Sequence, residues 1–345
     1  LSRGHRFDAW GPADGWSLRQ LIADQGRQPL AAFEAAYPRL QSRFYTLDTL
    51  DLDRALDGAD CVLVHEWNEP ALVARVGRHL RGSGVPLFFH DTHHRSVTDA
   101  PAMAALDLRD YDGVLAFGAT VAERYREAGW AARAWIWHEA ADVRRFRPLE
   151  RARDGDLVWI GNWGDEERSA ELMEFLVRPV ADLGLRATIH GVRYPSAALQ
   201  ALAQAGIEYG GWVANHRVPE VFARHRCTVH VPRRAYAGSL PGIPTIRMFE
   251  ALACGIPLVS APWDDAESLF RPGTDYLVAA DGAAMRRHLR TILGDPGFAA
   301  ALAARGLETV RARHTCGHRV DELLAILTEL QGTATPALDR LGQGA

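Results

Sequence analysis

The stretch PGIPTIRMFEALACGIP, residues 241–257, decides the predicted fold. A short apolar run, CTVHV at residues 227–231, precedes it, and a second, PLVS at residues 257–260, ends it. A Pro- and Gly-containing loop followed by a helical pattern between two apolar runs predicts a strand, a turn, a helix with Thr245 at its N-cap and a second, parallel strand. The unpaired amides at a helix start attract anions, so the turn is a candidate phosphate site. The same pattern also fits a plain βαβ crossover without a ligand.

The same alternation of apolar runs and helical patterns continues in both directions along the chain, and it predicts an α/β protein with parallel sheets. The predicted strands are residues 61–65, 86–90, 113–117, 134–137, 157–160, 187–190, 207–209, 228–231 and 257–260. The predicted helices are residues 70–81, 100–108, 119–128, 169–183, 196–205, 218–224, 245–254 and 283–293. Both halves of the chain are therefore expected to be doubly wound.

An arginine-rich segment without apolar periodicity, RRFRPLERARDGD at residues 144–156, separates the two series and is the predicted linker. We expect an N-terminal domain over residues 1–148, a C-terminal domain over residues 149–330 and a loose tail over residues 331–345. The opening LSRGHRFDAW lacks a methionine and resembles a helix end followed by the second strand of a doubly wound domain. The first strand of that domain is expected to be missing, through either a fragment or another N-terminal arrangement.

Composition excludes several classes of protein. The formal net charge is −4, which gives no general attraction to nucleic acid. All 39 basic residues are arginines, so there is neither a Schiff-base lysine nor a P-loop lysine, and a bound phosphate must be held by arginine, histidine or backbone amides. No apolar run reaches the roughly 20 residues that span a bilayer, and no signal-peptide pattern is present. A cytoplasmic protein is expected, with peripheral membrane association left open.

Four cysteines stand far apart, and their spacing predicts neither a disulfide framework nor a metal site. Cys61, Cys227 and Cys254 lie in apolar runs, where buried thiols are expected.

The helix in the deciding stretch carries a family resemblance. FEALACGIPLVSA, residues 249–261, resembles the FEALACG-x-P-V-V-A/S signature of GT-B glycosyltransferases related to family 4, and residues 157–327 resemble the spore-maturation-protein (CgeB) type of that group. HEAADVRRFRP, residues 138–148, is similar to the NG-V-D-x-x-x-F-x-P turn that closes their N-terminal domain, with Glu139 in place of asparagine. The resemblance implies two Rossmann-like domains that face each other across a cleft.

The resemblance also implies roles for the residues of the deciding stretch. Glu250 would accept hydrogen bonds from the ribose hydroxyls, and the backbone at Thr245 and Ile246 would meet the diphosphate. The further residues expected at this part of the nucleotide-sugar site are Arg233, Gly242, Ile243 and Arg247. Gly242 stands where the family usually has a second glutamate that contacts the donor sugar, so the sugar and the retaining outcome stay open.

Two more loops would complete the nucleotide-sugar site. In the turn that begins with Gly161 and Asn162, the family supplies a basic residue to the diphosphate, and Arg168 is the local candidate. The alternative is an exposed Arg168 paired with a neighbouring glutamate, Glu166 or Glu171.

The loop at Trp212 and Val213 resembles the segment that holds the nucleotide base, with the backbone of Val213 reading the base edge. The alternative for Trp212 is a residue of the domain core.

Histidines crowd two predicted strand ends in the N-terminal half, HEWNEP at residues 65–70 and FFHDTHHRS at residues 88–96. Strand ends of this kind are the usual place of a site in open α/β sheets. The resemblance places His93, with Asp91, near the acceptor, where it would orient or deprotonate the hydroxyl group. A histidine that only caps the next helix is the alternative. Metal binding is disfavoured, because residues 90 and 91 of an extended strand point to opposite faces.

The function implied is transfer of a sugar from a nucleoside-diphosphate sugar to a hydroxyl acceptor, with Glu250, His93 and Asp91 as the candidate catalytic residues. We expect no metal and no cofactor, and retention of the anomeric configuration over inversion. The partners expected are the nucleotide-sugar donor and an acceptor that the sequence does not identify. The alternatives are a GT-B sugar-nucleotide epimerase and a catalytically silent nucleotide-sugar-binding protein.

Overall fold

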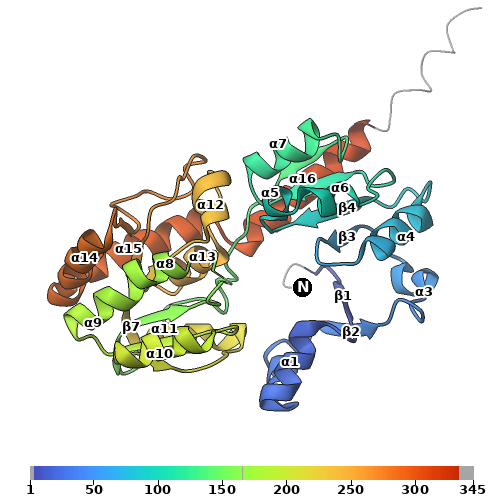
Figure 1. The fold of residues 1–345 in the computed structure, drawn as a ribbon. Coiled ribbons are helices and arrows are strands. Elements are labelled where there is room, and N and C mark those ends of the chain that lie inside the picture. Colours follow the sequence, from blue (N-terminus) through green and yellow to red (C-terminus); the bar gives the residue numbers. More distant parts are fainter. Residues whose placement is uncertain (1–3, 165, 334–345) are drawn as a thin grey trace, which may run out of the picture.

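Three parallel β-sheets form the framework of the protein in the computed structural model, which describes residues 4–164 and 166–333 (Figure 1). The strand orders are β1-β2, β3-β4-β5-β6 and β12-β11-β10-β7-β8-β9. The strands are β1 (Asp8–Pro12), β2 (Gln41–Tyr45), β3 (Val62–His65), β4 (Leu87–Asp91), β5 (Gly113–Ala116), β6 (Ala134–Ile136), β7 (Gly155–Ile160), β8 (Ala187–His190), β9 (Glu208–Tyr209), β10 (His225–His230), β11 (Leu258–Ser260) and β12 (Leu277–Val278).

The N-terminal half is organised around the four-stranded sheet. Its strand β4 buries Leu87, Phe88 and Phe89 almost completely, which is the continuous apolar run expected of a parallel strand covered on both faces. The helices of this half are α1 (Trp16–Gln25), α2 (Gln28–Ala36), α3 (Leu52–Leu56), α4 (Pro70–Leu80), α5 (Arg95–Thr98), α6 (Ala100–Ala104) and α7 (Ala119–Glu127). Helix α4 begins with a proline at its first turn and buries Leu72, Val73 and Val76.

The C-terminal half is organised around the six-stranded sheet. Its helical segments are α8 (Ser169–Leu172), the π-helical turn η1 (Met173–Val177), α9 (Arg178–Leu183), α10 (Ser196–Gln204), the 3₁₀ turn η2 (Asn215–Arg217), α11 (Val218–Ala223), α12 (Arg234–Ser239), α13 (Ile246–Ala253), α14 (Gly282–Gly294) and α15 (Pro296–Arg313). Asp281 and Asp295 cap α14 and α15, each by accepting an amide of the first turn.

The last helix, α16 (Cys316–Thr333), returns to the other half of the molecule (Figure 1). Its Ile326 packs against Phe88 and Leu115 of the four-stranded sheet. The chain therefore crosses between the halves twice, and the crossings meet where the Cys316 amide donates to the Ala141 carbonyl at 3.1 Å. The boundaries predicted at residues 148 and 330 remain predictions, but α16 lies on the N-terminal sheet although it falls within the predicted C-terminal domain.

The predicted fold class, α/β with parallel sheets, is confirmed. Every predicted strand is present, while β7 and β10 begin earlier than expected. The helix predicted over residues 100–108 ends at Ala104, because the chain turns there and Asp107 pairs locally with Arg109. The sequence did not predict β2, β12, α1, α2, α3, α5, α12, α15 or α16.

The opening of the chain contains a strand, β1, but this strand pairs with β2 in a separate sheet and not with the four-stranded sheet. Residues 1–3 of the predicted helix end and residues 334–345 of the predicted tail lie outside the described residues. All four cysteines are free: Cys227 and Cys254 are buried as expected, whereas Cys61 is only partly buried and Cys316 is exposed.

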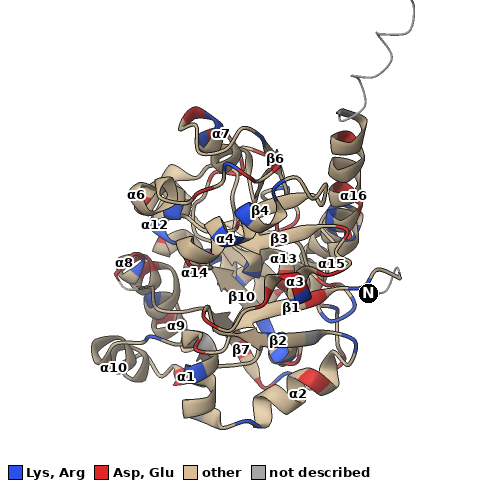
Figure 2. Ribbon diagram, turned by 90° about the vertical axis from the view of Figure 1, so that its right-hand side faces the viewer, with Lys and Arg blue, Asp and Glu red and all other residues tan. Residues whose placement is uncertain are grey.

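Acidic and basic residues are interspersed over both halves, and every basic residue drawn in Figure 2 is an arginine. Within residues 4–164 and 166–333, none of the helices combines the length and the apolar character that crossing a membrane requires.

Candidate functional site

The loop before α13 is held between the two halves. Thr245 occupies the predicted N-cap position, but its side chain caps no amide of α13. Leu240 and Ile243 are buried in the hydrophobic core of the N-terminal half, and the Thr120 hydroxyl donates to the Pro241 carbonyl at 3.1 Å. The start of α13, which carries unpaired amides and the positive end of the helix dipole, is thus fixed at the junction of the two domains.

Glu250 lies on α13 in a polar group of three residues. The residue is only 3% exposed. Oε1 accepts a hydrogen bond from Asn215 Nδ2 at 2.9 Å, Oε2 forms an ion pair with Arg247, and Arg247 donates to Asn215 Oδ1 at 2.7 Å. The predicted residues Glu250 and Arg247 are therefore brought together, and Arg247 compensates the buried carboxylate. Asn215 was missed by the sequence analysis, although it follows the predicted base-binding loop by only two residues.

Arg168 is a buried cation with no acidic partner. It is 7% exposed, donates from Nη1 to the Val231 carbonyl at 2.9 Å, and lies 5.0 Å from the ring centre of Trp159. Its Nε is buried without a hydrogen-bond partner, and no carboxylate of the described residues forms an ion pair with it. Burial, with a smaller contribution from Arg233, lowers the pKa of Arg168 to about 10.

The alternative interpretation of Arg168, an exposed arginine paired with a nearby glutamate, does not fit the structure. Glu171 instead binds the exposed Arg234, with Nε to Oε1 at 2.7 Å. A buried guanidinium group with an unused donor and no ion-pair partner among the described residues is suited to binding an anion.

Gly161 and Asn162 form the turn beside Arg168. The Asn162 carbonyl accepts from Arg168, and its side-chain Oδ1 accepts the Val192 amide at 3.2 Å. The Tyr194 hydroxyl donates to the Gly161 carbonyl at 2.8 Å. These bonds attach the turn to the chain that follows β8, and the Asn162 carbonyl holds Arg168 against the turn.

Arg233 lies at the contact between the halves. Its Nη1 donates to Glu167 at 2.7 Å and lies 3.4 Å from Nε2 of His94, which belongs to the N-terminal half. The structure thus places Arg233, which was predicted at the nucleotide-sugar site, at the junction of the halves. The carboxylate of Glu167 already neutralises its charge there.

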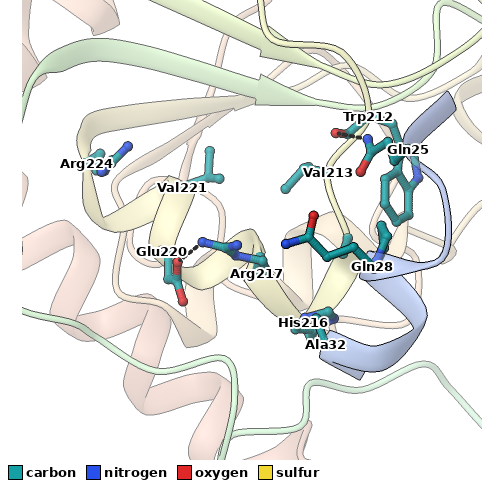
Figure 3. A pocket seen from close by; sticks show the side chains of 12 residues that line it. Gln25, Gln28, Ala32, Trp212, Val213, His216, Arg217, Glu220, Val221 and Arg224 are labelled. Atoms are coloured by element: carbon teal, nitrogen blue, oxygen red, sulfur yellow. Dashed lines mark hydrogen bonds and ion pairs between the residues drawn. The ribbon is translucent and has the colours of Figure 1, made fainter. Parts of the chain in front are cut away.

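Trp212 and Val213 line a pocket of about 400 Å³ between α2 and α11 (Figure 3). The Trp212 carbonyl accepts from Gln25 Nε2 at 3.4 Å, so both halves contribute to the wall. A second pocket, of about 190 Å³, is lined by Asn162 and Trp212 together. Trp212 is partly exposed at these walls and belongs to no core cluster of the described residues, which leaves its indole ring available to a flat ligand.

Asp91 and His93 are close in sequence, but their side chains do not form a catalytic dyad. Asp91 has no exposed surface, and its two oxygens accept from the His93 amide at 3.0 Å and the Tyr125 hydroxyl at 2.8 Å. Burial raises the pKa of Asp91 to about 6. The carboxyl group therefore shapes the turn that carries His93 and is shielded from any substrate.

The imidazole of His93 lies against the rings of Trp67 and His94, with centroids 4.7 and 3.9 Å away. Its Nδ1 is buried and unpartnered. Burial and the neighbouring His94 lower the pKa of His93 to about 3, so the ring is neutral. The alternative of a helix cap is not seen: His94, not His93, occupies the N-cap of α5, and no side chain caps that helix.

A buried ion pair supports this histidine loop. Glu66 is 1% exposed and accepts from Arg95 Nε at 3.0 Å, while Arg95 also stacks over Trp67 with 4.7 Å to the ring centre. Burial, followed by the nearby Asp91, raises the pKa of Glu66 to about 7. No three His, Cys, Asp or Glu side chains in the described part of the chain are grouped as metal ligands.

Glu267 fills the space beside Gly242. A side chain at Gly242, where φ is +83°, would place its Cβ 2.7 Å from Glu267 Oε1. Glu267 also joins the halves: Oε1 accepts the Ala119 amide at 2.9 Å and Oε2 lies 3.1 Å from His138 Nε2. No local sequence pattern indicates this contact, because Glu267 lies 25 residues after Gly242 in the chain.

Comparison with known proteins places these observations in a family context. Residues 168–325, a little under half of the chain, match the family described as "Glycosyl transferase-like". No protein with a curated description matches the sequence.

Solved structures resemble nearly the whole chain. Sucrose-phosphate synthase from Thermosynechococcus elongatus is 15% identical, with a TM-score of 0.58 over 91% of this chain and 80% of that one. A glycosyltransferase from Rickettsia africae is 10% identical, with a TM-score of 0.64 over 96% and 91%. Anabaena HepE, solved in complex with UDP-glucose, is 13% identical, with a TM-score of 0.64 over 93% and 99%.

These identities are too low to transfer an activity, but the similarity in fold covers both halves. The chain therefore has the GT-B fold, and its C-terminal half is similar to the glycosyltransferase-like family.

Proposed function

We propose that this protein is a glycosyltransferase that moves a sugar from a nucleoside-diphosphate sugar to a hydroxyl group of an acceptor, with UDP as the favoured nucleotide. The observation that carries the proposal is the buried Arg168, which has an unused donor, no carboxylate partner within residues 4–164 and 166–333, and a bond to the carbonyl of Val231, where the loop toward α13 begins. The match of residues 168–325 to a glycosyltransferase-like family supports it, and the UDP-glucose bound to HepE supports the choice of nucleotide.

The diphosphate would lie between Arg168 and the start of α13. Negative charge develops on this group as the bond to the sugar breaks, and preorganised donors at that place lower the barrier most effectively. Arg168 and the backbone at Thr245 and Ile246 would supply these donors, so we propose a reaction without a bound metal or cofactor. Glu250 would accept from the ribose, and Trp212 with Val213 would hold the base.

The acceptor would bind beside His93. The ring of His93 is neutral and is hydrogen-bonded to no carboxylate of the described residues, so it is a weak base. Because inversion of configuration needs a strong general base, the weak basicity of His93 supports retention. His93 would orient the acceptor hydroxyl through a ring nitrogen. The new bond to the anomeric carbon forms as the bond to the diphosphate breaks, and the hydroxyl proton leaves with the diphosphate oxygen.

Closure over the donor would take place near residues 144–156, the predicted linker, whose last two residues belong to β7, as in other two-domain enzymes. The contacts of Glu267 and Arg233 across the junction would hold the closed arrangement.

Titration calorimetry of the purified protein with a panel of UDP-, GDP- and ADP-sugars tests the donor. We expect at least one UDP-sugar to bind, and Glu250→Ala to weaken that binding. Mass spectrometry of the same mixtures, with and without simple glycoside acceptors, then separates three outcomes. A glycosylated acceptor supports the proposal, an epimerised donor supports an epimerase, and an unchanged donor supports a silent binding protein. Failure of every nucleotide sugar to bind would overturn the proposal.

A further inference from the structure

Trp16 is an exposed tryptophan that the proposed function does not yet use. It begins helix α1, four residues after the end of β1, and the carboxyl end of a parallel strand is the usual place of a site in open α/β sheets. The residue is 53% exposed, and no aromatic ring or arginine of the described residues stacks on its indole. Single exposed aromatic residues are common on protein surfaces, so the meaning of Trp16 depends on what lies beside it.

Two pockets lie beside Trp16, and Trp212 of the predicted base-binding loop lines both of them. Their volumes are about 190 and 490 Å³, and they adjoin each other because they share Trp16, Gln20, Gln25, Val192 and Trp212. The larger volume is within the usual range of small-molecule sites. The two indole rings do not contact each other in the part of the chain that the structure describes, so the space that they line is open to a flat ligand.

The same space adjoins the turn that holds Arg168. Asn162 lines the smaller pocket together with Trp16 and Trp212. The Asn162 carbonyl also accepts a hydrogen bond from Arg168. At the other end of α1, Gln25 Nε2 donates to the Trp212 carbonyl at 3.4 Å and ties the helix to this loop. A nucleotide whose diphosphate binds at Arg168 can therefore extend past Asn162 and place its base beside the two tryptophans.

We propose that the base of the nucleotide binds between Trp16 and Trp212, so that each half of the protein supplies one aromatic wall of the base site. This inference rests on the proposed function and adds the N-terminal half to the recognition of the base. Every nucleobase has a flat π face, and stacking on an aromatic side chain stabilises it without a directed hydrogen bond. Trp16 contacts the base alone, so its contribution is separate from that of Arg168 at the diphosphate and of His93 at the acceptor.

Stacking requires a flat ring at position 16, whereas packing of α1 requires only apolar volume. Trp16→Phe keeps a flat ring, Trp16→Leu keeps apolar volume without one, and Trp16→Ala removes both. The three variants should fold normally, because Trp16 is half exposed and belongs to no core cluster of the described residues.

Calorimetry of the full chain with UDP tests the proposal. We expect Trp16→Ala and Trp16→Leu to bind UDP about tenfold more weakly than the wild type, which corresponds to the loss of one base–aromatic stack, and Trp16→Phe to stay within about threefold. Phe44→Ala is the matched control. Phe44 of β2 is 55% exposed and lines neither pocket, so its replacement should change UDP affinity by less than about twofold.

Three results would overturn this inference and leave the proposed donor in place, because the wild type still binds UDP in each of them. Trp16→Leu that binds as tightly as Trp16→Phe would show that only apolar volume matters. Trp16→Ala with wild-type affinity would remove Trp16 from the site. An equal loss in Phe44→Ala would mean that the effect is not particular to these pockets. Wild-type protein that does not bind UDP would remove the proposed donor as well.

Discussion

Both halves of the molecule contribute to the candidate site, but they differ in whether their buried charged side chains have partners. In the C-terminal half, the cation of Arg168 is buried with no acidic partner in the part of the chain that the structure describes. In the N-terminal half, the acids Glu66 and Asp91 are partnered within the domain by Arg95 and Tyr125, although Oε1 of Glu66 has no hydrogen-bond partner among the described residues, and His93 is neutral. An unmatched cation is a place for an anionic ligand, whereas partnered acids hold a loop in shape.

This difference suggests a division of labour. The C-terminal half would provide the binding energy for the diphosphate, and the N-terminal half would position an uncharged acceptor. Substitutions at Arg168 and in the histidine loop should therefore separate affinity for the nucleotide from turnover.

The largest effect is expected for Arg168→Met, which keeps most of the side-chain volume and removes the charge. A hydrogen-bonded charge is worth up to about 3 kcal/mol, so UDP affinity should fall about 100-fold, measured by calorimetry. Arg234→Met is the control, because Arg234 is an exposed arginine paired with Glu171 and should change affinity by less than about twofold. Equal losses in the two variants would mean that net charge alone, and not the buried site, attracts the nucleotide.

Glu250→Ala should weaken the binding of UDP by about 2 kcal/mol, which is roughly a 30-fold loss of affinity. The ribose loses its hydrogen-bond acceptor, and Arg247 loses its ion pair. Comparison with 2′-deoxy-UDP separates these causes. Wild-type protein should prefer UDP to the deoxy form, and Glu250→Ala should bind both equally. A preference that persists in the variant would assign the ribose to another residue.

His93→Ala tests the N-terminal half. Turnover with the accepted donor should fall about tenfold, because the acceptor hydroxyl loses its orientation, while the dissociation constant of UDP stays within about twofold. His65→Ala, a change at the neighbouring strand end, is a control for altered packing of the histidine loop. A parallel loss of UDP affinity in His93→Ala would contradict the division between the two halves.

The smallest effect is expected for Glu267→Ala, which cuts a link between the halves. The Ala119 amide and His138 both lose a partner, and the free energy of unfolding in urea should fall by about 1 kcal/mol. Glu267→Gln keeps an acceptor for the Ala119 amide and should recover part of this loss. Unchanged stability in Glu267→Ala would show that the hydrophobic contacts of Leu240 and Ile243 suffice to hold the halves together.

Part of the candidate site was predictable because its signal is local. The helix with Glu250, the N-cap position of Thr245 and the turn before Arg168 all follow from spacing within a few residues, and the structure has them where the pattern predicts. The burial of Arg168 was not predictable, because its partners, the Val231 carbonyl and the Trp159 ring, belong to two different strand ends. The assigned roles of the site residues stay predictions until the variants are measured.

The sequence by itself determined the α/β class, the alternation of the predicted strands with the predicted helices, and the need for arginine, histidine or backbone amides at any phosphate, because these depend on apolar periodicity and on the absence of lysine. Only the tertiary structure decided that Glu267 fills the space beside Gly242 and that α16 returns to the N-terminal sheet. Each of these pairs residues far apart in the chain. Burial and charge at such contacts depend on how the two domains pack, which no local pattern records.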